Sequence, residues 1–139
     1  MREGIDAVTH RSVASEAALP LAATTYYFAN ADELIAEVCV RLALGDAADT
    51  ASLLWRCESY VEAHRHSALR GVIAESSATL EDLLTQALAC CGFKSEPEDA
   101  RLMLAAIDGA VLHAIAKRTD PHSLGATVVA RLVAYLPRA

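Results

Sequence analysis

Helix-start and helix-stop signals divide this sequence at short intervals, and this division constrains the fold more than any other feature. From residue 30 onwards, apolar residues recur three and four positions apart between Gly45, Gly92 and the Asp120–Pro121 pair. Capping boxes are indicated where Asn30 precedes Glu33 and where Ser95 precedes Glu98. The pattern predicts an all-α chain with helices over about 30–44, 49–64, 68–91, 96–117 and 121–136.

The composition agrees with a helical globular chain. Hydrophobic residues make up 54% of the 139 positions, with many Ala and Leu, so a core can be buried. We find no apolar run of the roughly 18 residues that a membrane span needs, and no apolar signal-peptide core near Met1. We therefore expect a cytoplasmic protein without a membrane partner. The net charge of −6 excludes a protein that coats nucleic acid indiscriminately, but it leaves room for a local DNA site.

The first thirty residues contain a pattern of two short helices. The pattern places them over about 10–17 and 20–27, joined by a turn at Ala18–Leu19, with Pro20 at or beside the start of the second. Helices of this length need packing against a neighbour to be stable, and the helix that follows Asn30 could supply it. The pair is typical of a helix-turn-helix, although an ordinary pair of bundle helices would have the same pattern.

This segment resembles the DNA-binding domain of the TetR family of bacterial transcription regulators. The resemblance covers about a quarter of the chain and rests on Thr9-His10-Arg11, Val13-Ala14, Glu16 to Leu19, Tyr26-Tyr27-Phe28 and Asn30 to Leu34. It implies a recognition helix over 21–27. It also implies that DNA contacts come from His10, Arg11, Leu21, Ala23, Thr25, Tyr26 and Tyr27.

The segment also departs from the family pattern. There is no room before Gly4 for the family's first helix, Ala18 replaces the usual turn Gly, and Ala31 stands where Lys is common. Acidic residues outnumber basic ones here, which weakens phosphate attraction. We therefore expect operator binding by this chain to be weak or lost. The missing helix could be natural, or the chain could be a fragment or have a misassigned start.

The resemblance implies two regions: a helix-turn-helix remnant at 1–44 and a helical ligand-binding and dimerisation bundle at 45–139. Two functions remain open. The first is a TetR-like regulator, a repressor that binds operator DNA as a homodimer and is released by a small-molecule effector. The second is a ligand-binding and dimerisation module without effective DNA binding. The sequence has no nucleophile-and-base motif and no Gly-rich phosphate loop, so we do not expect an enzyme.

The predicted effector is a small apolar or amphipathic molecule. Aromatic side chains with polar tips can supply both contact area and orientation to a pocket between helices. The candidate pocket residues are Trp55, Tyr60, His64 and Asp108. Ordinary core packing is the competing interpretation for the aromatic residues.

The predicted dimer interface lies on the last two helices. Ala106, Ala110 and Ala114 recur every fourth residue, which would allow a second copy to approach closely and form a four-helix bundle. The full candidate set is Met103, Ala106, Ala110, Ala114, Val128 and Leu132. The alternative is that this face belongs to the chain's own core.

Metal and redox chemistry have weak support. Glu62, His64 and His66 are close in sequence, but residues two apart on a helix point to opposite sides. The four cysteines lack the paired short spacings of a zinc site, and we expect them to be reduced thiols. We predict no metal and no cofactor.

Overall fold

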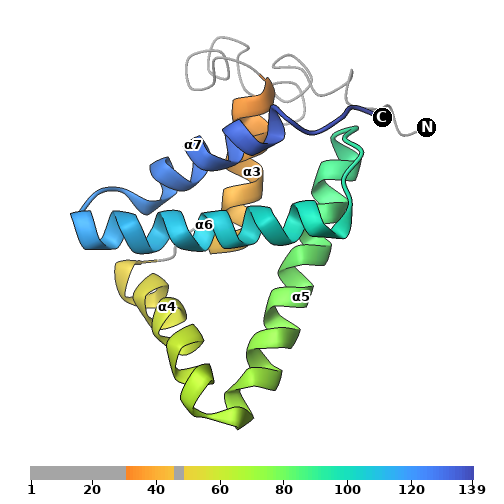
Figure 1. Ribbon diagram of the computed structural model, residues 1–139. Helices are drawn as coiled ribbons and strands as arrows, with labels where there is room; N and C mark the ends of the chain where they lie inside the picture. Colours follow the sequence, from red (N-terminus) through yellow and green to blue (C-terminus); the bar gives the residue numbers. More distant parts are fainter. Residues whose placement is uncertain (1–30, 46–48) are drawn as a thin grey trace.

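The computed structural model describes residues 31–45 and 49–139, and within these ranges it contains five helices. They are α3 (Ala31–Leu44), α4 (Thr50–Arg65), α5 (Ser67–Cys90), α6 (Pro97–Lys117) and α7 (Pro121–Val133) (Figure 1). The predicted all-α class is confirmed. The predicted recognition helix and its candidate DNA contacts, His10, Arg11, Leu21, Ala23, Thr25, Tyr26 and Tyr27, lie outside the described residues.

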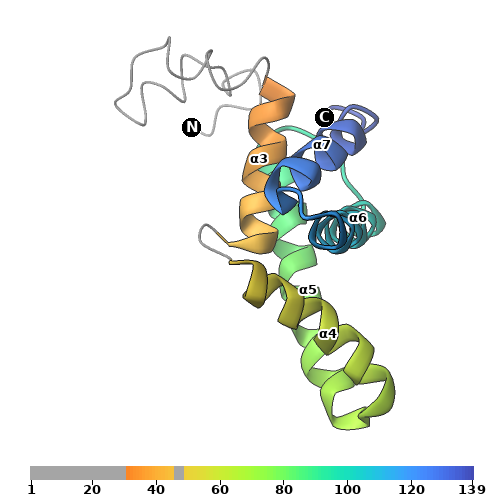
Figure 2. The ribbon, with the colours of Figure 1, turned by 90° about the vertical axis from the view of Figure 1, so that its left-hand side faces the viewer.

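The helices form a packed body from which one hairpin projects. α6 packs along α7, α3 packs against α7, and the last part of α5 joins them. α4 and the first half of α5 extend away from this body as a helical hairpin, so that α4, α5 and α6 outline a triangle (Figure 1). Figure 2 shows the same hairpin pointing away from α3 and α7, with α6 and α7 on one side of the body and α3 on the other.

Local capping interactions explain where the helices begin. The Asp49 carboxylate accepts the Ser52 N–H at 2.7 Å at the start of α4, and Asp120 accepts the N–H groups of His122 and Ser123 at the start of α7.

The capping box of α6 consists of Glu96 and Asp99, so the predicted Ser95–Glu98 box was wrong by one residue. Pro97 occupies the first turn, where its missing N–H costs no helix bond, and this position makes Glu96 the cap.

The helix ends also follow local backbone geometry. Gly45 and Gly92 have φ of 80° and 78°, left-handed values that glycine adopts without strain and that commonly end helices. α7 ends at Val133, earlier than the predicted residue 136. The N–H groups of Tyr135 and Leu136 instead donate to carbonyls three residues back, which is the pattern of a tighter turn.

The core lies where α3, α6, α7 and the end of α5 meet. Its largest fully buried side chains are Ile35, Val40, Leu84, Leu88, Met103, Ile107, Val111, Val129 and Val133. The apolar residues of α3 do not all face this core, because Val38 is 45% exposed while Cys39 and Val40 are buried. α3 therefore shares one core with the helices beyond residue 49, and the proposed division at residue 44 stays a prediction.

The first half of α5 is not part of this core. The large apolar side chains of α5 are fully buried only at Leu84 and Leu88, whereas Val72 is 62% exposed and Leu69 is 39% exposed. α5 contacts α3 and α6 through its C-terminal part. Among the described helices, the first half of α5 has only α4 as a neighbour. The hairpin thus leaves a large apolar surface uncovered.

The two sides of α6 should respond very differently to truncation. Ile107→Ala removes a fully buried side chain and should lower the free energy of unfolding by about 2–5 kcal/mol. Leu102→Ala on the same helix truncates a side chain that is 64% exposed and should cost less than about 0.5 kcal/mol in the monomer. Urea denaturation at low protein concentration measures both, and equal losses would contradict the packing of α6.

Candidate functional site

A cavity of about 650 Å³ lies between α4 and the first half of α5. This volume is in the usual range for small-molecule sites. One wall comes from α4 and its N-cap, and the other comes from α5. The lining residues are Asp49, Ala51, Ser52, Trp55, Arg56, Ser59, Tyr60, Val72, Ile73, Ser76 and Ser77.

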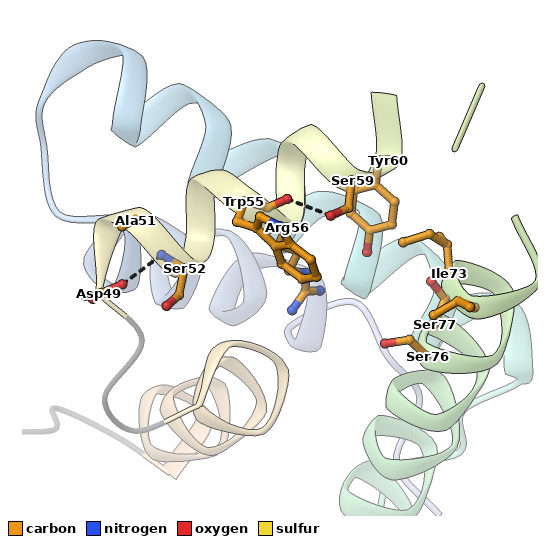
Figure 3. A pocket seen from close by; sticks show the side chains of 11 residues that line it. Asp49, Ala51, Ser52, Trp55, Arg56, Ser59, Tyr60, Ile73, Ser76 and Ser77 are labelled. Atoms are coloured by element: carbon orange, nitrogen blue, oxygen red, sulfur yellow. Dashed lines mark hydrogen bonds between the residues drawn. The ribbon is translucent and has the colours of Figure 1, made fainter. Parts of the chain in front are cut away.

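Trp55 is the largest apolar side chain that lines the cavity. Its side chain is 70% exposed, an unusual state for the largest apolar residue type, and it faces Ile73, Ser76 and Ser77 across the gap between the helices (Figure 3). Ser59, one turn further along α4, donates its hydroxyl to the Trp55 carbonyl at 2.8 Å. The site therefore offers an accessible indole beside several hydroxyl groups.

Arg56 links the cavity wall to two other helices. Its Nη2 lies 2.8 Å from Oδ1 of Asp108 on α6, and each side chain is 21% exposed. Its Nη1 donates to the carbonyl of Ala43 in the last turn of α3. The Tyr60 hydroxyl also bonds to Asp108. One guanidinium thus joins α3, α4 and α6 directly behind the cavity.

Burial is the main cause of the pKa shifts of Asp108 and Tyr60, the two side chains beside Arg56. Burial raises the pKa of Asp108, and the positive charge of Arg56 and the hydroxyl of Tyr60 oppose that rise without cancelling it. The pKa of Tyr60 is also raised, first by burial and then by the negative charge of Asp108. Tyr60 therefore keeps its proton at neutral pH and serves as a donor to Asp108.

A smaller hollow of about 250 Å³ adjoins the cavity towards the tip of the hairpin. It shares Trp55, Ser59, Val72 and Ile73 with the cavity and adds Glu58, Glu62 and Leu69. The cavity and this hollow together are called the α4–α5 groove below.

The candidate pocket residues divide into three groups. Trp55 and Tyr60 line the cavity, and Asp108 lies behind it through Arg56. His64 lies elsewhere: it is exposed in the last turn of α4, where its carbonyl accepts Arg70 Nη2 at 3.0 Å. Arg56 was missed, although a basic residue beside Trp55 and a lone Asp in the apolar α6 segment could have suggested a pair.

Three of the six candidate dimer residues lie inside the chain. Met103, Ala110 and Ala114 are 1%, 6% and 0% exposed, so a second copy cannot reach them. This corrects the predicted interface on these three residues: they pack into the chain's own core, and the phase of α6 differs from the one we assumed. Ala106, Val128 and Leu132 are half-buried.

The exposed side of α6 has a regular apolar pattern of its own. Leu102 is 64% exposed and Leu112 is 51% exposed. The complete exposed series is Leu102, Ala105, Gly109, Leu112 and Ala116, and its alternating spacing of three and four residues is typical of helix pairing. We call this series the α6 stripe.

The residues considered for a metal have other partners. Glu62 accepts Arg65 Nη1 at 3.0 Å and lies 3.4 Å from His66 Nε2. In the described part of the chain, no group of three His, Cys, Asp or Glu side chains could hold a metal ion. No helix in that part is both long and apolar enough to cross a membrane.

Comparison with known proteins identifies the helical body. The family model for the tetracyclin repressor-like C-terminal domain matches residues 30–137, a range that includes all of α3 to α7. No curated protein and no solved structure matches the chain. The matched range is also the range over which the helices form one core with a groove beside it. The chain therefore belongs to the TetR-like family through a tetracyclin repressor-like C-terminal domain.

Proposed function

We propose that this protein is a TetR-type transcription regulator whose α4–α5 groove binds a small apolar or amphipathic effector. In this proposal the chain acts as a homodimeric repressor, residues 1–30 contact operator DNA, and the effector releases it. The single observation that supports effector sensing best is Arg56. It lines the cavity and at the same time bonds α3, the helix that leads to residues 1–30.

The hydrogen bond from Arg56 to α3 can couple the cavity to the end of α3. Ala43 is in the last turn of α3, where carbonyls lack helical partners and the helix dipole is negative. A guanidinium there stabilises the position of the helix end. An effector that shifts α4 must either carry the end of α3 with it or break this bond.

Binding alone would not produce regulation. An effector changes a conformational equilibrium only if it binds one state better than the other. The hairpin is the described element with the most uncovered apolar surface, so we expect the two states to differ in the distance between α4 and α5. Arg56 then converts a movement of α4 into a movement of α3.

Arg56→Gln should separate effector binding from its effect on α3. The probe is 4-(1-naphthyl)butan-1-ol, whose ring matches Trp55 and whose hydroxyl matches the groove serines. In the parent protein, calorimetry should detect saturable binding, and hydrogen exchange should show altered protection of α3 amides. At saturating probe, Arg56→Gln should lose most of the α3 response, because the link to Ala43 is gone.

Arg70→Gln is the matched control. Arg70 also binds carbonyls, those of Ala63 and His64, but at the tip of the hairpin and without contact to α3. This variant should keep the α3 response. An absence of probe binding to the parent would contradict the groove as an effector site, and a full α3 response in Arg56→Gln would contradict the link.

The α6 stripe is the surface we propose for the homodimer. Gly109 adds no side chain to the stripe, and a Cβ there would meet nothing within 4 Å in the chain itself. A second copy could therefore approach α6 closely at this position. α6 and α7 form one side of the body in Figure 2, which leaves room for a four-helix pairing across a two-fold axis.

Leu112→Glu should shift the protein from dimer to monomer while its helices remain folded. The charge would enter the centre of the proposed interface, but in the isolated chain the side chain is already 51% exposed. Leu83→Glu on α5, where the side chain is 40% exposed, is the control and should leave the dimer mass unchanged. Light scattering with circular dichroism distinguishes the two, and an unchanged dimer in Leu112→Glu refutes this interface.

Operator binding is proposed from the sequence of residues 1–30. Because we expect this chain to bind an operator weakly or not at all, the substitutions are made in a version extended at its N-terminus by a TetR-type first helix. Arg11→Ala should weaken binding to every DNA sequence and reduce the salt dependence by about one unit of slope, as expected for a phosphate contact. Thr25→Ala should change which sequences are preferred, as expected for a base contact. Gel shifts over a salt series measure both. Tight, sequence-specific binding by the chain without the extension would contradict the expected loss, and failure of the extended version to bind any operator would favour the alternative, a dimerisation and effector-binding module.

A further inference from the structure

The α4–α5 groove has an excess of negative charge. Three carboxylates line it, those of Asp49, Glu58 and Glu62, whereas Arg56 is its one cationic lining residue among those described. Arg56 is already neutralised by Asp108 behind the wall. The groove therefore has no uncompensated positive charge with which to hold an anion.

The three carboxylates differ in whether they already have hydrogen-bond or ion-pair partners. Asp49 caps α4 through the Ser52 N–H, and Glu62 is bonded by Arg65 with His66 nearby. Glu58 is exposed and makes no hydrogen bond or ion pair within the described ranges. It is thus a charge that can pair with a ligand without losing an existing partner.

Glu58 lies next to the accessible aromatic ring. It follows Trp55 by three positions on α4, so the two side chains share one face of the helix, and both line the smaller hollow. The other apolar side chains there, Leu69 and Val72, are 39% and 62% exposed. An aromatic face beside a carboxylate attracts organic cations, through the ring quadrupole and direct charge pairing.

We infer that the effector of this groove is a cationic amphiphile. Its flat apolar body lies in the larger cavity against Trp55 and Ile73, and its positive head occupies the smaller hollow beside Glu58. The inference rests on the proposed effector function and specifies its ligand class. The net charge of −6 adds a long-range attraction of the same sign.

The test compares three ligands that share one apolar body and differ in the head group and its charge. Each has a naphthyl ring on a butyl chain, and the chain ends in trimethylammonium, hydroxyl or carboxylate. Isothermal titration calorimetry of the full 139-residue chain should rank their affinities in the order cation, neutral, anion. The cation should bind about three- to tenfold more tightly than the alcohol at low salt, and this ratio should fall as salt rises.

Three variants show which residues cause the preference for the cation. Glu58→Gln, which keeps the shape of the side chain, should reduce cation affinity about three- to tenfold and leave the alcohol unchanged. Asp82→Asn is the matched control, because Asp82 is an exposed α5 carboxylate outside the groove whose removal changes net charge equally. It should change neither affinity. Trp55→Ala should weaken all three ligands.

The outcomes separate the ligand class from the proposed function. Equal affinity for all three ligands, or a preference for the carboxylate, overturns the cationic effector while leaving an effector groove in place. Cation selectivity that Glu58→Gln and Asp82→Asn reduce equally also overturns it, because net charge would then be the cause. If none of the three ligands binds, both the ligand class and the groove's proposed function fail.

Discussion

One half-buried guanidinium connects the three parts of this domain that a regulator must couple. Arg56 lines the cavity from α4, pairs with Asp108 on α6 and donates a hydrogen bond to a carbonyl of α3. Such a pair is not the most stable arrangement available. The pKa of Asp108 is raised because burial outweighs its partners, so the charges are retained at a cost in free energy. The hydrogen bond of Arg56 to α3 and its ion pair with α6 are what an apolar replacement could not supply.

The two sides of α6 explain why the packing of this helix was only partly predictable from its sequence. Its sequence contains two stripes of small and large apolar residues, and both have a spacing suited to helix packing. Which stripe faces inward depends on where α3 and α7 lie. The sequence of α6 alone does not determine these positions. The core takes Met103, Ile107 and Ala110, and the exposed stripe begins at Leu102, about 100° away around the helix. A small-residue stripe alone therefore predicts close packing but not the packing partner.

The sequence predicted those features whose physics is local. Caps, glycines with positive φ and the Asp120–Pro121 start depend on a few neighbouring residues, so the helices were found within a few positions of their ends. Trp55 and Tyr60 were identified because aromatic side chains with polar tips suit pockets. The serines of α5 were not, because they acquire their role only when the hairpin brings α5 opposite α4. The pairing of Arg56 with Asp108 likewise joins residues far apart in sequence.

The hairpin is also the described element that can rearrange at the lowest cost. Only Leu53 and Ala63 of α4 are buried, and its ends are held by polar contacts, Arg56 at the base and Arg70 at the tip. An effector that covers Trp55 and Val72 gains apolar burial worth roughly 2–4 kcal/mol. Only the part of this gain that differs between two states of the hairpin can shift their equilibrium, and a typical allosteric coupling of about 1–3 kcal/mol is no larger than the gain itself. The uncovered apolar surface thus lies on the hairpin whose helix α4 is linked to α3 through Arg56.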